Sequence, residues 1–368
     1  MKYLDEYRDA NRAQQLLERI RQRATRRWVL MEVCGGQTHS LLKYGIDEAL
    51  EDVVELIHGP GCPVCVTPQS IIDHAIELAQ RPGILLCSFG DMLRVPGSTE
   101  SLQHVKARGG QVKVVYSPVD AVEMAAQQPD LEVVFFAVGF ETTAPATALA
   151  LLQAAERKLR NFSLLSHHVR VQPAMEAIMR MPDCRVQGFL AAGHVCTVMG
   201  FESYSRFVAQ HEVPVVVTGF EPCDLLAGIL ECIEQVESGR FEISNEYARS
   251  VRPEGNLHAQ ELINQVYVVT DQEWRGMGVI PAGGYVMREC WSAYDAAFRF
   301  PIAAQRHGEC QSQCRAGDVL AGQLKPTECA AFGRACTPDT PLGAPMVSSE
   351  GACAAYYRYR LPLLEFVT

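Results

Sequence analysis

The stretch WVLMEVCGGQTHS, residues 28–40, begins as an apolar run and ends in a glycine-rich turn that carries Cys34 and His39. A continuous apolar run is typical of a strand that is buried on both faces of a parallel sheet. Glycines directly after such a strand let the chain turn sharply and let its backbone approach a bound group. We therefore predict a parallel strand here, with a thiol just beyond its carboxyl end.

The same pattern recurs along the first 240 residues, where short Val/Ile/Leu runs alternate with helical patterns. This alternation predicts an α/β fold with two doubly wound parallel-sheet domains. The segment 5–27 is rich in Arg and has the apolar spacing of an amphipathic helix. The predicted strands are 28–33, 52–57, 83–89, 112–117, 131–138, 162–167, 186–191 and 213–218, and the other predicted helices are 68–80, 118–127, 143–158 and 222–236.

Beyond residue 240 the alternation fades, and Gly, Pro and Cys become dense between 276 and 353. We interpret this part as a smaller Cys-rich domain whose core is supplemented by something other than side chains. The predicted domains are an N-terminal α/β domain (1–120), a second α/β domain (121–240) and a C-terminal domain (241–368).

Composition limits the partners. The chain has 33 Lys and Arg against 43 Asp and Glu, a net charge of −10, which argues against binding to nucleic acid or to a membrane surface. The opening MKYLDEYRDANR is charged, and no run approaches the roughly 18 apolar residues of a membrane span. We expect a cytoplasmic protein, in which the 14 cysteines are buried, redox-active or metal-binding.

A second strand with a thiol turn is predicted in DVVELIHGPGCPVC, residues 52–65, which carries Cys62 and Cys65. The carboxyl ends of parallel strands meet at one edge of a sheet, so these two thiols and Cys34 can converge. The glycines of both turns can offer N–H donors, and the prolines stiffen the second turn. Structural burial alone is a poor explanation, because a Gly-Pro-Gly loop makes poor core material.

Three kinds of chemistry suit three converging thiols. The C-x2-C pair can cycle between dithiol and disulfide. Three thiolates and His39 fit a tetrahedral zinc ion. A soft site with open positions fits low-spin iron that carries further small ligands.

The C-terminal part contains Cys314, Cys329, Cys336 and Cys353 with the spacing C-x14-C-x6-C-x16-C. This is neither of the common ferredoxin spacings, yet four cysteines among Gly and Pro turns suggest a cubane iron–sulfur cluster. Zinc is the alternative, although the paired C-x2-C knuckles of zinc sites are absent. Cys310 lies close enough to Cys314 to compete for that ligand position.

Polar residues in other strand-end loops can line the same crevice. AVGFETTAP (137–145) and VTGFEPCD (217–224) both place Gly-Phe-Glu after a strand, so that Glu141 and Glu221 can face a shared cleft. The alternative makes them helix N-terminal carboxylates that complement the helix dipole. Asp91, Arg94 and His194 are further candidates around the site, for which helix capping or turn stabilisation is the alternative.

Taken in order, six motifs resemble the HypD family of hydrogenase maturation factors over residues 28–359. They are CGGQTH, GPGCPVC, SFGDMLRVPG, FFAVGFETTAP, AAGHVCTVMG and TECAAFGRACTPDTPLGAPMVSSEGAC. The resemblance implies two α/β domains and a C-terminal domain with a 4Fe–4S cluster. It also implies a scaffold, formed with a HypC-like small chaperone, on which the Fe(CN)2CO unit of nickel–iron hydrogenase is assembled with cyanide from a HypE-like donor supplied by HypF.

By the same resemblance, Cys34, Cys62 and Cys65 are the iron-site thiols, and the four C-terminal cysteines hold the cluster. Two positions depart from the family pattern. Gln37 stands where the family usually has the first histidine, and glutamine cannot carry a proton near neutral pH. Pro345 stands where the family often has a cysteine, and proline cannot ligate a metal.

The mechanism that we expect is that of a redox-active assembly scaffold rather than of a turnover enzyme. Its thiols must be reduced to bind iron or to attack a thiocyanate-like donor, and a nearby cluster can supply electrons. The alternatives are an iron–sulfur-dependent thiol–disulfide reductase that acts on a protein substrate, and a zinc-stabilised binding protein. The predicted catalytic residues are Cys34, Cys62, Cys65 and His39.

Overall fold

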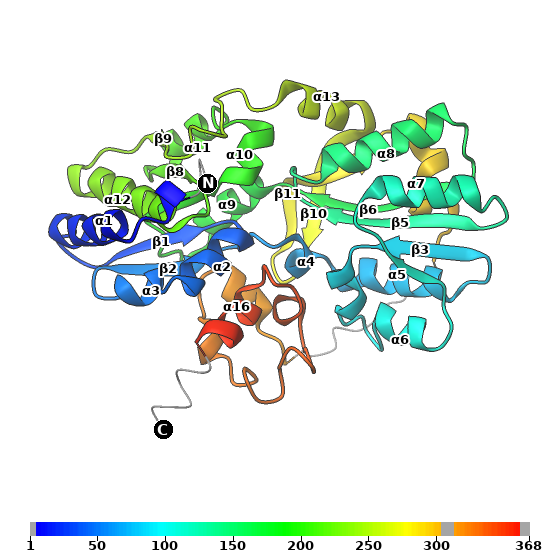
Figure 1. Ribbon diagram of the computed structural model, residues 1–368, viewed down its shortest axis with the longest axis horizontal. Coiled ribbons are helices and arrows are strands. Elements are labelled where there is room, and N and C mark those ends of the chain that lie inside the picture. Colours follow the sequence, from blue (N-terminus) through cyan, green and yellow to red (C-terminus); the bar gives the residue numbers. More distant parts are fainter. Residues whose placement is uncertain (1–4, 303–312, 361–368) are drawn as a thin grey trace.

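The computed structural model describes residues 5–302 and 313–360, and it contains two sheets in two neighbouring lobes (Figure 1). The C-terminal segment, drawn in orange and red, packs below the centre of the molecule, against the helices that carry the thiol turns. Cys310 lies outside the described residues. Among the residues that are described, no helix has the length and apolar character that a membrane crossing requires.

Sheet A is entirely parallel, with the order β2-β1-β7-β8-β9. One face is covered by α1 and α12, and the other by α9 and α11. Its strands are β1 (Trp28–Glu32), β2 (Val54–His58), β7 (Gly188–Ala192), β8 (Val215–Thr218) and β9 (Ile243–Asn245); its covering helices are α1 (Ala10–Arg23), α9 (Val171–Met179), α11 (Tyr204–His211) and α12 (Pro222–Ser238).

Sheet B is mixed, with the order β10-β11-β6-β5-β3-β4, in which β10 and β11 form an antiparallel hairpin. Helices α5 and α6 cover one face, and α7, α8 and α13 cover the other. The strands are β3 (Ile84–Ser88), β4 (Val112–Val114), β5 (Glu132–Gly139), β6 (Phe162–Val169), β10 (Tyr267–Trp274) and β11 (Gly278–Met287); the helices are α5 (Gln69–Gln80), α6 (Leu102–Ala107), α7 (Pro118–Gln127), α8 (Ala144–Glu156) and α13 (Leu257–Val266).

The shorter elements lie in the connections and in the C-terminal segment. Those beside the strand ends are α2 (Gly35–Lys43), α3 (Ile46–Ala49), α4 (Pro63–Val66), η2 (Gly90–Arg94) and α10 (Gly193–Met199). The remainder are η1 (Asp5–Tyr7), η3 (Glu289–Tyr294), α14 (Ala296–Arg299), α15 (Ala316–Leu320), η4 (Pro326–Glu328), η5 (Ala344–Met346) and α16 (Ala352–Tyr359).

The predicted α/β class and all eight predicted strands are confirmed, but the predicted boundaries at 120 and 240 do not separate the two sheets. The chain builds β1 and β2 in sheet A, β3–β6 in sheet B, β7–β9 again in sheet A, and finally β10 and β11 in sheet B. Strand patterns report local burial and contain no information about which sheet a strand joins. Each lobe is therefore discontinuous in sequence.

The hairpin β10–β11 was not predicted from the sequence. Val268, Val269, Val279 and Val286 are exposed, so the two strands lack the continuous apolar burial of the others. Pro281 and two glycines also interrupt β11. The antiparallel hairpin makes sheet B mixed rather than purely parallel.

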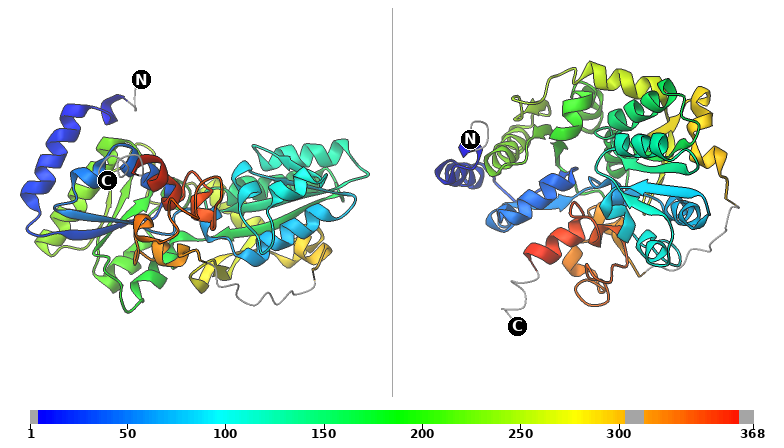
Figure 2. Two further views of the ribbon diagram at one scale, coloured as in Figure 1. Left: turned by 90° about the horizontal axis from the view of Figure 1, so that it is seen from below. Right: turned by 45° about the vertical axis from the view of Figure 1, so that its right-hand side comes forward.

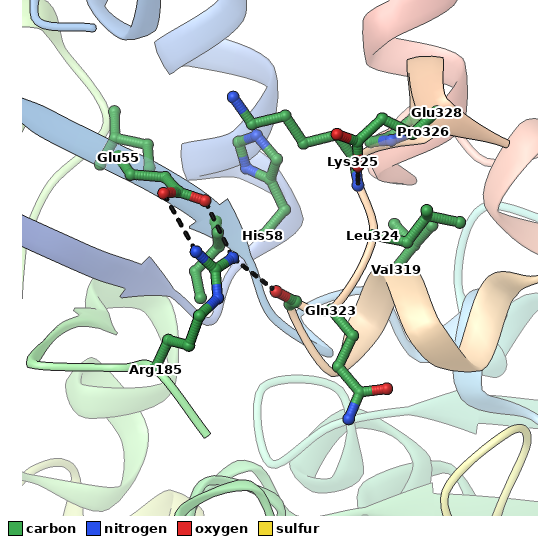
Figure 3. Close-up of a pocket in the computed structure, with 12 residues that line it drawn as sticks. Glu55, His58, Arg185, Val319, Gln323, Leu324, Lys325, Pro326 and Glu328 are labelled. Atoms are coloured by element: carbon green, nitrogen blue, oxygen red, sulfur yellow. Dashed lines mark hydrogen bonds and ion pairs between the residues drawn. The ribbon is translucent and has the colours of Figure 1, made fainter. Parts of the chain in front are cut away.

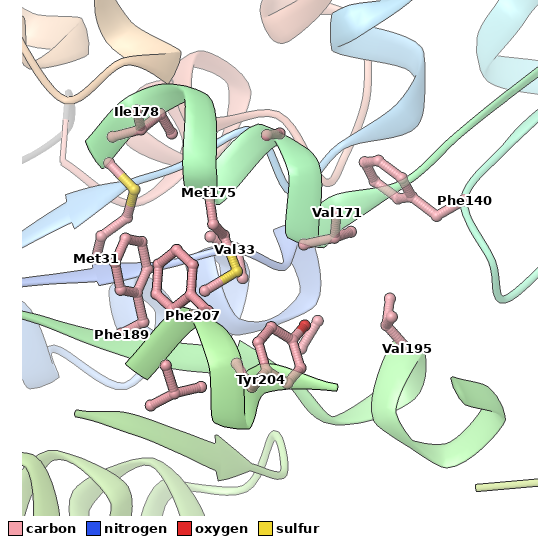
Figure 4. Packing of buried hydrophobic residues seen from close by; sticks show 14 of the residues in the cluster. Met31, Val33, Phe140, Val171, Met175, Ile178, Phe189, Val195, Tyr204 and Phe207 are labelled. Carbon is pink, nitrogen blue, oxygen red and sulfur yellow. The ribbon is translucent and has the colours of Figure 1, made fainter. Parts of the chain in front are cut away.

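The two lobes share one buried cluster, part of which Figure 4 shows. Met31, Phe189 and Phe207 come from the sheet A lobe, whereas Phe140 follows β5 and Trp274 ends β10 in sheet B. The rings of Phe140 and Trp274 are 6.0 Å apart. Because this core is continuous between the lobes, it fixes the strand ends of the two sheets relative to each other.

Each sheet has a point at which the strand order reverses. In sheet A, the chain passes from β1 to β2 on one side, and β7 joins β1 on the other. In sheet B, β4 and β5 flank β3 in the same way. Ligands of open α/β sheets bind outside the carboxyl ends of the strands at such points. Figure 2 shows the C-terminal segment packed at the junction between the lobes.

Candidate functional site

Cys34 and the Cys62–Cys65 turn are held together by direct backbone contact. Cys34 lies two residues beyond the end of β1 and is the N-cap of α2. Gly35 N donates to Gly61 O at 2.9 Å. A Cβ on Gly61 would overlap the backbone N and Cα of Cys34, so only glycine allows the two loops to lie this close.

Cys62 and Cys65 form a disulfide. Cys62 is the N-cap of α4, and its Sγ accepts from Cys65 N at 3.2 Å. Both residues are buried, and the partly buried Cys34 packs against the same apolar cluster. The structure thus brings the three predicted thiol positions to one edge of sheet A.

Glu32 is a site residue that the sequence analysis missed. Its buried carboxylate accepts from Cys34 N at 2.8 Å, contacts the Thr38 hydroxyl and lies 2.8 Å from His58 Nδ1. His58 Nε2 lies 3.2 Å from the hydroxyl of Tyr356 in α16. A buried polar chain therefore runs from the Cys34 turn to the C-terminal segment.

His39, predicted as a catalytic or ligand residue, faces the C-terminal segment. Its Nε2 lies 3.0 Å from the hydroxyl of Tyr359, and the two rings pack edge to face. Burial, followed by the nearby charges of Arg358 and Lys43, lowers its pKa below the usual 6.5. His39 thus forms part of the contact between α2 and α16.

Gln37, which follows the two glycines of the Cys34 turn, is fully buried. Its Nε2 donates to Ala191 O at 3.0 Å and to Thr218 Oγ1 at 2.6 Å. The side chain thereby ties the start of α2 to β7 and β8, which is a structural role that needs no proton transfer.

Glu141 and Cys196 occupy the junction between the lobes. Glu141 is buried, accepts from Val171 N at 3.1 Å, and has its pKa raised to about 7 by burial. Burial, and then the charges of Glu141 and Cys34, raise the pKa of the Cys196 thiol. Cys196 therefore lies within electrostatic range of both. The sequence analysis missed it, although it belongs to the quoted motif AAGHVCTVMG.

His194 lies beside the start of α2. Its ring stacks on Phe220 with centroids 3.9 Å apart, and burial lowers its pKa. Phe220 in turn lies 3.2 Å from the position of a Cβ on Gly36. The structure thus places His194 one ring away from the Cys34 turn.

Asp91 and Arg94 connect sheet B to the C-terminal segment. They lie 3.9 Å apart, and Arg94 Nη2 donates to Val347 O at 2.8 Å. The Asp91 carboxylate helps to raise the pKa of Glu350, after the larger effect of partial burial. Glu350, which was not predicted, packs against Gly35. The pKa of Cys34 is raised to about 12, mainly because Cys34 is buried and secondly because the Glu350 carboxylate is near.

Glu221 does not join this group. Its carboxylate accepts from Arg8 Nη2 at 2.9 Å and caps the N-terminus of α12. For this residue the structure supports the helix-cap interpretation.

The four C-terminal cysteines line a single apolar pocket. Leu342 N donates to the sulfur of Cys336 at 3.4 Å, and a Cβ on Gly343 would overlap the sulfur of Cys314. Burial and then the three neighbouring thiols raise the pKa of Cys353. The pocket is lined by Cys314, Cys329, Cys336 and Cys353 together with Arg315, Ala316, Val319, Ala331, Phe332, Leu342 and Met346.

This donor set fits a metal cluster in its chemistry, because four thiols share an apolar pocket and like charges would repel one another there without a cation. Across residues 5–302 and 313–360, no three His, Cys, Asp or Glu side chains are arranged to hold one metal ion. Pro345 is buried in η5 outside the pocket lining, so the four cysteines need no ligand at that position.

A separate polar pocket of about 190 Å³ lies between β2 and residues 319–328 (Figure 3). Arg185 donates to Glu55 at 2.9 and 3.1 Å and to Gly322 O at 3.4 Å. His58 forms part of its wall. These contacts hold the C-terminal segment against sheet A.

The structure is that of a two-lobed α/β protein in which a disulfide turn lies where the lobes meet and a four-cysteine segment packs beside it. The family model described as "HypD: Hydrogenase formation hypA family" matches residues 11–360. The chain belongs to this family of hydrogenase maturation factors.

Individual relatives match along nearly the whole chain. The hydrogenase maturation factor HypD of Azotobacter vinelandii is 46% identical over 368 residues, which cover 98% of this chain and 97% of that protein. The hydrogenase maturation factor HypD of Escherichia coli (strain K12) is 44% identical over 368 residues and 98% of both chains. That of Rhodobacter capsulatus is 45% identical over 370 residues, again 98% of both.

The first prediction follows from the close backbone contact between Gly61 and Cys34. Gly61→Ala should lower the free energy of unfolding by about 1–3 kcal/mol, because the new Cβ must push the Cys34 turn away. Gly90→Ala is the matched control, since its Cβ would meet only Val114 at 3.8 Å. Denaturant titration measures both, and equal effects would contradict the close-contact argument.

The second prediction concerns Glu141 and the pH dependence of the folding stability. Its pKa is raised from 4.5 to about 7 in the folded state, so the folded protein loses stability from this group as pH rises through that window. Glu141→Gln should therefore gain on the order of 3 kcal/mol relative to the parent chain between pH 4.5 and pH 8. Denaturant midpoints across this range measure the gain.

Glu123→Gln provides the control for that measurement, because Glu123 forms an exposed ion pair with Arg157. This variant should retain the pH dependence of the parent chain. A Glu141→Gln variant with the same pH dependence as the parent would show that Glu141 ionises normally.

Proposed function

We propose that this protein is the scaffold on which the Fe(CN)2CO unit of nickel–iron hydrogenase is assembled. A HypC-like small chaperone would share the iron, and a HypE-like protein would donate cyanide. The observation that carries the proposal is the contact between Gly35 and Gly61, which holds Cys34 against the Cys62–Cys65 turn. A disulfide that must be reduced to thiols for function suits the reducing cytoplasm.

Iron is the cargo in this proposal, and the thiols must be prepared to receive it. Opening the Cys62–Cys65 disulfide consumes two electrons and two protons and yields two thiols. Cys34, whose pKa is raised to about 12, is protonated at neutral pH in the empty site. Binding a cation favours the thiolates, so iron entry would release protons from the crevice.

The released protons need acceptors near the thiols. Glu141 has a pKa of about 7 and lies within electrostatic range of Cys196, so it can hold or release a proton at physiological pH. His194 stacks beside the Cys34 turn and has a lowered pKa, so it is neutral and able to accept a proton. We propose both as proton-handling residues rather than as iron ligands.

Cys314, Cys329, Cys336 and Cys353 would hold a 4Fe–4S cluster, which supplies one-electron chemistry when it is bound. Glu350 contacts Gly35 and lies three positions before Cys353 in the sequence. Three extended residues span at most about 11 Å, so this pocket and the Cys34 turn are close neighbours. The electrons for the disulfide would come ultimately from an external reductant.

The alternative is an iron–sulfur-dependent thiol–disulfide reductase, and the Cys62–Cys65 disulfide favours it. Both disulfide cysteines are buried, however, whereas a reductase must present one sulfur to its protein substrate. Burial suits a small ligand better than a protein disulfide, so we favour the scaffold.

Infrared spectroscopy separates these two functions. Anaerobically purified protein in complex with its small chaperone should show cyanide and carbonyl stretching bands, and Cys34→Ala should abolish them. Cys223→Ala is the control, because this buried thiol lies against Asp9 O near α1, outside the crevice. Disulfide reduction on a protein substrate without such bands would favour the reductase instead.

Metal analysis tests the second thiol group. The anaerobically purified protein should contain about four iron and four sulfide ions per chain in the pocket of the four C-terminal cysteines. The Cys353→Ala variant should lose most of both. Zinc in place of iron would contradict the cluster. The Cys34→Ala protein should keep the cluster iron, which distinguishes the two sites.

A further inference from the structure

The turn of the β10–β11 hairpin contacts the segment that carries Cys62 and Cys65. Arg275, in this turn, donates its backbone N–H to Val66 O at 2.8 Å, and Val66 directly follows Cys65. Figure 1 shows the hairpin running down the centre of the molecule to meet α4. The hairpin that the sequence did not reveal is therefore a direct neighbour of the disulfide.

The other side of the same turn touches the four-cysteine pocket. Gly276 has φ +78°, and a Cβ there would lie 2.7 Å from Gly317 Cα. Gly317 and Ala316 begin α15, and Ala316 lines the pocket and donates its N–H to Cys314. The turn is thus wedged between the two thiol groups, and its glycines let the backbones touch.

Arg275 brings an unneutralised charge to this position. Its Nη1 is shielded from solvent and has no hydrogen-bond partner in the described part of the chain. Burial lowers its pKa, while the two groups that act in the opposite direction are Cys314 and Asp73. Asp73 is occupied by hydrogen bonds from Ser98.

A shielded guanidinium without a partner is unfavourable, so its position calls for negative charge from another source. The nearby Arg315 offers a contrast, because it follows Cys314 directly but is largely exposed and pairs with Asp318 at 2.6 Å. The charge of Arg315 is balanced by the Asp318 carboxylate, whereas Nη1 of Arg275 has no such partner in the described residues. Within residues 5–302 and 313–360, the acidic groups that act on Arg275 are Cys314 first and Asp73 second, and Cys314 belongs to the four-cysteine pocket.

We propose that Arg275 is the counter-cation of the group bound by the four thiolates and that its charge raises the reduction potential of that group. This inference depends on the cluster proposed above. With four thiolates, a 4Fe–4S cluster carries a net charge of about −2 when oxidised and about −3 after it gains one electron. A fixed nearby cation stabilises the more negative form, and therefore favours reduction.

The test compares reduction potentials of the anaerobically purified full chain. Dithionite titration with redox mediators, followed by electron paramagnetic resonance, should give a more negative midpoint potential for Arg275→Gln than for the parent. Arg275→Lys, which keeps the charge, should stay near the parent value. Arg288→Gln is the matched control, because Arg288 lies at the other end of β11, where it donates to Asn264 O.

Two results would overturn the proposal. One is an unchanged potential in Arg275→Gln with the cluster intact; the other is an equal shift in Arg275→Lys, which would assign the effect to shape rather than charge. If Arg275→Gln fails to retain iron, retention in Arg275→Lys supports the counter-cation and loss from both variants refutes it. A parent chain without iron and sulfide would defeat the cluster proposal itself, and the present inference with it.

Discussion

The close approach of Gly61 to Cys34 is the contact on which the site depends. Two parallel strands deliver thiol turns to the same edge of sheet A, but adjacency alone leaves room for side chains between the loops. Glycine removes that room, and the bond from Gly35 N to Gly61 O fixes the relative position of the turns. The buried carboxylate of Glu32 then fixes the other side by accepting from Cys34 N. The geometry is set by backbone, so the sulfur atoms remain available for chemistry.

The C-terminal segment completes this arrangement. Glu350 packs on Gly35, while Tyr356 extends the polar chain that starts at Glu32 and passes through His58. Removing the Tyr356 hydroxyl would leave the buried Nε2 of His58 without this partner, which is costly. The segment therefore supports the Cys34 turn physically while it gathers four thiols of its own. Few of its residues lie in regular structure, so its position depends on these contacts with sheet A.

The sequence predicted the elements well and their assembly only in part. Apolar runs located the strands, because burial on both faces removes alternation, and the strand ends located Cys34, Cys62 and Cys65. Sheet membership was out of reach, since a run such as residues 186–191 looks the same in either sheet. Glu32 was missed because one carboxylate inside an apolar strand gives no pattern. Glu350 was missed because its role comes from a contact between residues more than 300 positions apart.

The crevice keeps its buried acidic groups mostly uncharged. The disulfide carries no charge, the raised pKa of about 12 keeps Cys34 protonated, and Glu141, with a pKa of about 7, is only partly ionised at neutral pH. A buried site with many acidic groups thereby avoids most of the cost of uncompensated anions. Loss of the protons from these groups would leave buried anions, whose cost a bound cation would offset. The same apolar surroundings that favour the neutral thiols would strengthen the attraction between their thiolates and a cation.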